Sequence, residues 1–244
     1  MRDALLVLPL VLSLIGAGLA ALWGLPAFNR RLSTVQAAWL VALAPLTAFV
    51  FLLSRLPSVL GGAALVWRTD WMPSLDMAAV LYLDGLGALF ALLVSGIGAL
   101  VVIYTGYYFR GDGSAWRFLT YLLLFMTSML GLVLAGDVIT LFVFWEGTSI
   151  TSFLLIGYKT KDEEARRGAF KALFITSGGG IALLAGLVFV AVLAGGADYP
   201  TILSRRDLLT TSPLYPVVLG LIAFGAFTKS AQAPAHIWLP AAMT

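Results

Sequence analysis

The sequence predicts an all-α protein, a polytopic transmembrane helix bundle of about seven spans with its N-terminus outside the membrane. Of its 244 residues, 61% are hydrophobic and only 11% are charged, and the mean hydropathy is +0.99. Ordinary soluble domains are about 45–50% apolar and about 25% charged. This composition excludes a soluble globular domain and a disordered chain. The apolar residues are also grouped in stretches of about 20, which is the length of a membrane-spanning helix.

Seven apolar stretches are long enough to cross a bilayer as helices. They are Leu5–Leu25, Gln36–Leu56, Asp84–Phe109, Phe118–Ala135, Val138–Tyr158, Arg167–Leu193 and Tyr215–Met243. We expect the first to be a retained helix rather than a signal peptide, because its apolar run is too long and Arg2 and Asp3 leave its start almost uncharged. Pro234 and Pro240 predict that the seventh helix is broken.

The distribution of Lys and Arg predicts the orientation of the bundle. The loops after the first, third and fifth spans carry Arg30, Arg31, Arg110, Arg117, Lys159, Lys161, Arg166 and Arg167. The opposite side carries Arg2, Arg55, Arg68, Arg205 and Arg206, mostly in longer connections. We therefore expect the N-terminus to lie outside and the loop 159–167 to lie inside.

The two long outer connections differ in pattern. Residues 57–83 hold Trp67 and Trp71 and alternate in polarity, which predicts a short hairpin at the membrane interface, where Trp is favoured. Residues 195–213 are typical of an irregular loop or short helices. Asp84 and Asp137 each stand at the start of a span, where we expect them to cap the first helical turn.

The residue inventory argues against redox and metal chemistry in this chain. It has no Cys, which excludes disulfides, iron–sulfur clusters and Cys-attached haem. A single His, His236, leaves too few ligands for a haem or zinc site. A net charge of +3 without a dense basic run gives no sign of nucleic-acid binding. We therefore expect no cofactor, no metal and no nucleic-acid partner.

Two ionisable residues lie where a charge is expensive. Glu146 is about eight residues, or about 12 Å, into the fifth span, and Lys229 is about fourteen residues into the seventh. A charge at the bilayer centre costs at least about 2.5–3.5 kcal/mol on insertion scales, and helix formation requires neither residue. We therefore expect both to be functional, each as the partner of the other.

A Glu146–Lys229 pair that separates and rejoins would act as a proton switch. Pairing favours both ions, whereas separation lets Lys229 release a proton and Glu146 take one up. The alternative is a fixed ion pair that joins two helices. Hydroxyl and amide groups near the two charges favour proton traffic, although such groups also bond to their own helix or join helices. They belong to Thr148, Ser149, Thr151, Ser152, Thr228, Ser230 and Gln232.

Three further features each have two interpretations. Lys171, one turn into the sixth span, either extends to the inner interface or passes protons from the cytoplasm to Glu146. His236 is either a proton relay or an interfacial histidine. The run Gly178–Gly180 predicts close approach of another helix, and no strand precedes it, which argues against a phosphate-binding loop.

Three segments carry a resemblance to a known family. LFVFWEGTSITSFLLIGY (141–158) and FGAFTKSAQAPAHIWLPAAM (224–243) resemble signature helices of the antiporter-like membrane subunits. These include the proton-pumping membrane subunits of respiratory complex I and the large subunits of Mrp-type sodium/proton antiporters. LYLDGLGALF (81–90) resembles the segment that opens the family's third helix. The resemblance covers essentially the whole chain, and ITSGGGIALLAG (175–186) is more similar to the A-type Mrp subunit.

The resemblance implies that Glu146 and Lys229 are the central proton-handling pair and that His236 lies beyond the helix break. Complex I members usually carry an acid near Gly180, so a sixth-helix acid is not expected here. Gly147 also departs from the bulky apolar residue that commonly follows the Glu, which we interpret as a change in packing.

The family fold implies a domain division. Its members have about fourteen core helices with two inverted five-helix repeats. Residues 1–110 would form an N-terminal three-helix membrane segment with an outer hairpin-like loop, and residues 111–244 would form the first, incomplete proton-channel repeat. Because the chain stops at Thr244, we expect a fragment or a split subunit without the second half-channel.

The function expected from this resemblance is that of a membrane subunit of a multi-subunit Na+/H+ antiporter, moving protons through a half-channel gated by Glu146 and Lys229. It would span the cell (inner) membrane several times, contact other membrane subunits and lipid, handle protons and Na+, and perform no redox chemistry, so an enzyme is not expected. One alternative is a proton-pumping subunit of an NADH:quinone oxidoreductase-like or membrane-bound hydrogenase-like complex. Another is a structural or assembly protein in which Glu146 and Lys229 only join helices.

Overall fold

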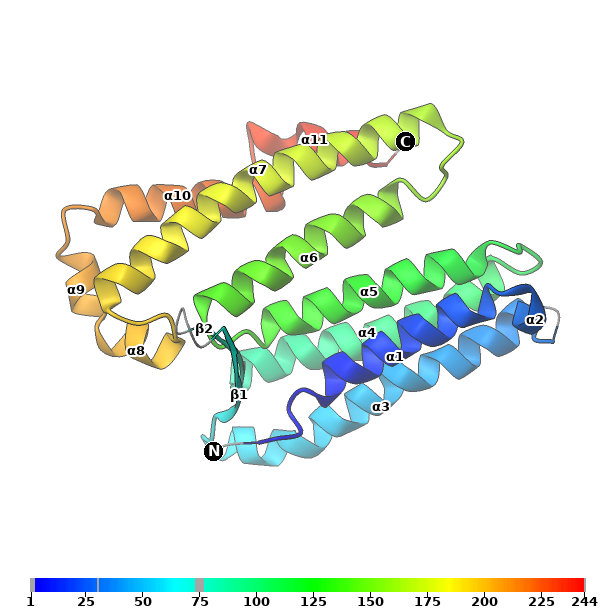
Figure 1. Cartoon of the computed structure of the whole chain (residues 1–244), viewed down its shortest axis with the longest axis horizontal. Coiled ribbons are helices and arrows are strands. Elements are labelled where there is room, and N and C mark those ends of the chain that lie inside the picture. The colour runs from blue at the N-terminus through cyan, green and yellow to red at the C-terminus, as the bar shows by residue number, and fades with distance from the viewer. Residues whose placement is uncertain (1–2, 30, 73–76, 244) are drawn as a thin grey trace. The chain divides into compact units, whose positions relative to one another are not determined.

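The computed structural model describes residues 3–29, 31–72 and 77–243, and these residues are mostly helical (Figure 1). The chain divides into two compact units, which are described one at a time. The first comprises Met1–Arg68 and Leu81–Leu134, and the second comprises Thr69–Val80 and Ala135–Thr244. Arg2 and Arg30, which the charge analysis assigned to opposite sides of the membrane, lie outside the described residues.

The described residues of the first unit form five helices. They are α1 (Leu8–Trp23), α2 (Pro26–Asn29), α3 (Thr34–Leu60), α4 (Gly85–Tyr108) and α5 (Ala115–Val133). α3 packs along α4, and α1 packs against both α3 and α5. Small residues permit these close approaches, as expected for membrane helices: a Cβ at Gly106 of α4 would lie only 2.5 Å from that of Ala38 in α3.

The ends of these helices follow ordinary capping chemistry. Ser33 and Gln36 form a capping box at the start of α3. Asp84 caps α4 by accepting a hydrogen bond from the Gly87 amide at 2.7 Å, which confirms the predicted capping role. α1 is shorter than the predicted Leu5–Leu25, and α3 continues to Leu60, beyond the predicted Leu56.

The predicted hairpin in residues 57–83 is present. β1 (Leu65–Met72) and β2 (Met77–Leu83) pair in a two-stranded sheet. In the first unit, the Tyr82 amide donates to the Leu134 carbonyl at 2.7 Å; in the second, the Gly136 amide donates to the Val80 carbonyl at 2.8 Å. The chain around β2 is therefore anchored by backbone hydrogen bonds within each unit.

The second unit consists of long helices and the short segments that join them. They are α6 (Val138–Ile156), α7 (Glu163–Ala194), α8 (Tyr199–Ser204), α9 (Arg206–Thr210), α10 (Tyr215–Lys229), the 3-10 turn η2 (Ala235–Ile237) and α11 (Trp238–Ala241). α7 is the central element, since α6, α10 and α11 all pack against it (Figure 1). The connection 195–213 forms short helices, one of the two forms expected for it.

Asp137 caps α6, as the sequence analysis predicts. One of its carboxylate oxygens accepts hydrogen bonds from the amides of Ile139 at 2.8 Å and Thr140 at 2.9 Å. The other accepts from the Val80 amide at 3.2 Å and from the Thr140 hydroxyl. The side chain is buried, so Asp137 joins the start of α6 to β2.

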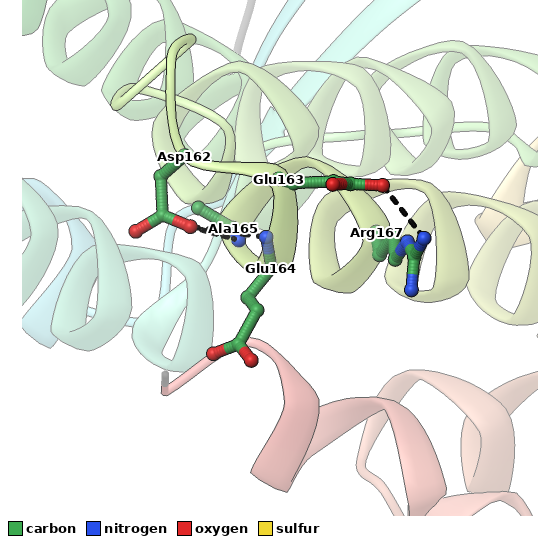
Figure 2. A network of polar contacts seen from close by, with 5 residues as sticks. All are labelled: Asp162, Glu163, Glu164, Ala165 and Arg167. Atoms are coloured by element: carbon green, nitrogen blue, oxygen red, sulfur yellow. Dashed lines mark hydrogen bonds and ion pairs between the residues drawn. The ribbon is translucent and has the colours of Figure 1, made fainter.

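α7 begins at Glu163, four residues before the predicted Arg167. Asp162 caps it by accepting hydrogen bonds from the Glu164 and Ala165 amides, and Glu163 pairs with Arg167 at 2.6 Å, one turn along the helix (Figure 2). Acidic residues in the first turn favour this start. The predicted range covers the apolar, membrane-spanning part of this helix, which begins with a charged first turn.

Among the described residues, five helices, α3 to α7, are long and apolar enough to cross a membrane. α1 and α10 are apolar but only 16 and 15 residues long. The count of seven spans and the outside location of the N-terminus therefore remain predictions. The division at residue 110 also remains a prediction, because it concerns an internal repeat and the compact units are defined by contacts.

Candidate functional site

The two charged residues singled out from the sequence lie within the second unit, where α6 and α10 pack against α7. Glu146 is in the middle of α6, and Lys229 is the last residue of α10. Lys229 lies at this helix end because the chain departs from helical geometry directly after it. The predicted break of the seventh helix is therefore confirmed, and within the predicted span Tyr215–Met243 the long helix α10 ends at Lys229.

The break after Lys229 has a clear local cause. Ala231 adopts a left-handed conformation with φ 52°, and the Gln232 amide turns back to donate to the Phe227 carbonyl at 2.9 Å. The indole N–H of Trp238 then donates to the Thr228 carbonyl at 2.9 Å. The backbone carbonyls of Phe227 and Thr228 at the helix end thus accept hydrogen bonds from outside the helix, as a broken helix inside a membrane requires. A cation at a helix C-terminus is also electrostatically favourable.

The ammonium group of Lys229 is held by α6. Its Nζ donates to Ser149 Oγ at 2.7 Å and to the Trp145 carbonyl at 3.3 Å. It also lies 5.4 Å from the centroid of the Trp145 ring, within the range of a cation–π interaction. Lys229 therefore contacts Trp145, the residue before Glu146, and Ser149, which lies one helical turn after Trp145.

The carboxylate of Glu146 is held by α7. Ser177 Oγ donates to Oε2 at 3.0 Å. Oε1 is buried and has no hydrogen-bond partner among the described residues. A Cβ atom at Gly180 would overlap Oε1, so the carboxylate occupies the space that the missing side chain leaves.

The two charges are neighbours without forming a direct ion pair. Both residues are in the described part of the chain, and no Glu146–Lys229 salt bridge is found there. The two predicted partners are therefore neighbours held apart in this structure, and their pairing and separation as a proton switch remain a prediction. The physical reason is that the ammonium is bound by Ser149 and the Trp145 carbonyl, while the carboxylate turns toward Ser177.

The other hydroxyl groups near the site mostly bond to their own helices. Thr148 donates to the Trp145 carbonyl at 2.7 Å, Thr151 to the Gly147 carbonyl at 2.7 Å, and Thr228 to the Gly225 carbonyl at 2.8 Å. These three residues therefore follow the simpler of the two interpretations, in which membrane Ser and Thr satisfy backbone carbonyls. Ser149 and Ser177 instead contact the charged groups.

The structure does not bring Lys171 or His236 into contact with the two charges. Lys171 is exposed on α7, six residues before Ser177, and His236 is exposed in η2, beyond the helix break. Neither side chain forms a hydrogen bond or ion pair with another described residue. Their roles as proton entry and relay remain predictions.

Three contributors to the site were missed by the sequence analysis. Ser177 is hard to recognise because isolated hydroxyl residues are common in membrane helices. The Trp145 carbonyl is a backbone group and leaves no signal in the sequence. Trp238 lies beyond the predicted break. Its indole N–H needs a hydrogen-bond acceptor inside a membrane protein, and this need was the one signal of its role.

Comparison with known proteins agrees with this architecture. The family model described as NADH:quinone oxidoreductase/Mrp antiporter, TM matches residues 135–244, and that described as NADH-Ubiquinone oxidoreductase (complex I), chain 5 N-terminus matches residues 71–119. The chain is 39% identical over 237 residues to the Na(+)/H(+) antiporter subunit A1 of Staphylococcus aureus, covering 97% of this chain and 28% of that protein.

Solved structures give the same relationship. A chain in the structure of the Mrp complex from Dietzia sp. DQ12-45-1b is 34% identical with a TM-score of 0.85, covering 98% of this chain and 25% of that chain. A chain of the archaeal membrane-bound sulfane sulfur reductase shares the fold, with a TM-score of 0.75 at 21% identity, covering 98% and 47%. This chain thus spans about a quarter of the length of its Mrp relatives.

The matched segments include both helices that carry the charged residues, and the fold agrees over nearly the whole chain. The chain is therefore a multi-pass membrane protein that belongs to the antiporter-like family of complex I and Mrp membrane subunits, and it is similar to the N-terminal part of the large A-type Mrp subunit.

Proposed function

We propose that this chain is part of a membrane subunit of a multi-subunit cation/proton antiporter and that protons move by way of Glu146 and Lys229. The observation that carries the proposal is the position of the Lys229 ammonium, hydrogen-bonded to Ser149 and the Trp145 carbonyl beside the Glu146 carboxylate. Both charges are costly inside a membrane and mark an ion pathway by default.

The two serine contacts suit a site whose charges change. A hydroxyl can accept a hydrogen bond or donate one. Ser149 accepts from the Lys229 ammonium, and by rotating its hydroxyl it can donate to the neutral amine that remains after the proton leaves. Ser177 donates to the Glu146 carboxylate and can accept from the protonated acid. Each serine therefore serves both protonation states of its partner, which a fixed ion pair does not need.

The remaining parts of the pathway follow from the positions of exposed groups. Protons enter from the side of Lys159 and Lys171, reach Glu146 over water, and pass through Lys229 toward the region beyond the helix break, where His236 lies. The exchanged cation is Na+, the partners are other membrane subunits, and the complex lies in the cell membrane. The identity to a Na(+)/H(+) antiporter subunit favours exchange over the pumping arm of a redox complex.

The alternative of a structural protein predicts a direct salt bridge between the two helices. The separate partners of Glu146 and Lys229 argue against that alternative. Because a buried ion pair adds little stability on balance, a purely structural role would also leave no reason to retain the two charges.

The experiment is cation-dependent proton flux in everted vesicles that contain the full assembled complex. We expect Lys229→Ala to lower the initial rate by about tenfold or more, since a positioned proton-transfer group typically contributes that much or more. Lys229→Arg retains a charge but cannot release its proton, so it should be slow as well. Near-normal flux in both variants at normal assembly would refute the proposal, and equal flux with Na+ and K+ would refute the choice of Na+.

A further inference from the structure

The three successive glycines of α7 face three different environments. A Cβ at Gly178 would meet nothing within 4 Å, and this residue is exposed. A Cβ at Gly179 would overlap the Thr228 side chain of α10. A Cβ at Gly180 would overlap Oε1 of Glu146, lie 3.1 Å from the carboxyl carbon, and lie 3.6 Å from Trp145 Cδ1. Only the third glycine therefore bears directly on a charged group.

The carboxylate of Glu146 is bound unevenly. Oε2 accepts from Ser177 Oγ at 3.0 Å, whereas Oε1 is buried without a partner among the described residues. Ser177 and Gly180 are three residues apart on α7, so they lie on the same face of the helix. One residue of this face thus holds an oxygen of the carboxylate, and the other leaves space for the second oxygen.

We infer that Ser177 and Gly180 are positioning residues for Glu146. Ser177 fixes Oε2, and Gly180 keeps open the space in which Oε1 binds and releases a proton without breaking the Ser177 hydrogen bond. The inference rests on the proposed function, because it assigns this arrangement to proton exchange at Glu146. A side chain at position 180, acidic or otherwise, would occupy the place of Oε1.

The central test compares Gly180→Ala with Gly178→Ala in the full assembled complex. Both replace a helical glycine of the same run with alanine, but only the first reaches Glu146. The atom that Gly180→Ala displaces is the far end of a flexible side chain, so the helix packing should survive. We expect proton flux about tenfold slower in Gly180→Ala and a normal rate in Gly178→Ala.

A second pair of variants tests the hydrogen bond and remains available if Gly180→Ala does not assemble. Ser177→Ala should slow proton flux severalfold. Ser177→Thr keeps the hydroxyl and should restore most of the rate. Equal rates in the Ala and Thr variants would overturn the role of Ser177.

An infrared measurement reads the carboxyl group itself. Its band is identified by its loss in Glu146→Gln. We expect the band to shift in Gly180→Ala and Ser177→Ala and to stay unchanged in Gly178→Ala. A slow Gly180→Ala variant with an unshifted Glu146 band would mean that position 180 acts through helix packing, which would overturn the inference.

The outcomes separate this inference from the proposed function. Normal flux in Glu146→Gln would overturn the proposed function and the inference with it. An inactive Glu146→Gln together with normal flux and an unshifted band in Gly180→Ala would overturn the inference alone. Loss of flux with a shifted band in Gly180→Ala, but not in Gly178→Ala, would support both.

Discussion

Replacing Ser149 with alanine removes the shortest contact that holds the Lys229 ammonium. In the structure, Nζ is 2.7 Å from Ser149 Oγ and 3.3 Å from the Trp145 carbonyl, so Ser149→Ala leaves only the longer hydrogen bond and the Trp145 ring. A hydrogen bond to a charged group contributes about 1.5–3 kcal/mol. The charged Lys229 should therefore occupy its position beside Glu146 less readily, by a factor of about 10–150.

The assay is the initial rate of proton flux in everted vesicles at equal levels of assembled complex. Ser152→Ala is the matched control, because Ser152 is on the same helix and its side chain forms no hydrogen bond with another described residue. We expect Ser149→Ala to transport several times more slowly than Ser152→Ala and Ser149→Thr to recover part of the rate. If Ser149→Ala and Ser152→Ala transport equally fast, the reasoning from the Lys229 contacts is wrong.

Three further predictions concern stability. Asp137→Ala should cost about 1–3 kcal/mol and accelerate hydrogen exchange at the Ile139 amide, because this first-turn donor loses the carboxylate that accepts its hydrogen bond; unchanged exchange would contradict this. Trp238→Phe leaves the Thr228 carbonyl without its indole donor and should cost about 1 kcal/mol in detergent unfolding, whereas wild-type stability would show that the bond is unimportant. In the same unfolding assay, Ala231→Gly should stabilise the wild-type protein by up to about 1 kcal/mol, because φ is 52° at this position and glycine adopts this conformation without strain; a loss of stability would contradict the left-handed turn.

The sequence was sufficient to predict the features that follow from the free-energy cost of burying a charge and from local chain geometry. Glu146 and Lys229 stood out because a charge inside an apolar span is expensive and has no structural justification. The break after Lys229 could be expected from Pro234 and Pro240, and the hairpin from its alternating pattern and Trp residues.

The features that depend on how helices meet could not be predicted. Among the many hydroxyl groups near the charges, the sequence gives no indication that Ser149 reaches Lys229 while Thr148 bonds to its own helix. The separate hydrogen bonds of Glu146 and Lys229 could not be predicted for the same reason, since Glu146 contacts Ser177 and fills the space at Gly180 on a different helix. The run Gly178–Gly180 predicted the close approach of another helix, which is confirmed, but it gave no indication that Gly179 would meet α10 and Gly180 would meet α6.

The most direct measurement is the proton flux of the assembled complex carrying Glu146→Gln, which keeps the size of the side chain and removes the proton-binding group. At wild-type levels of assembled complex, we predict an initial rate of about one tenth of the wild-type rate or lower. A rate within about twofold of the wild type would contradict the assignment of proton transfer to this carboxylate.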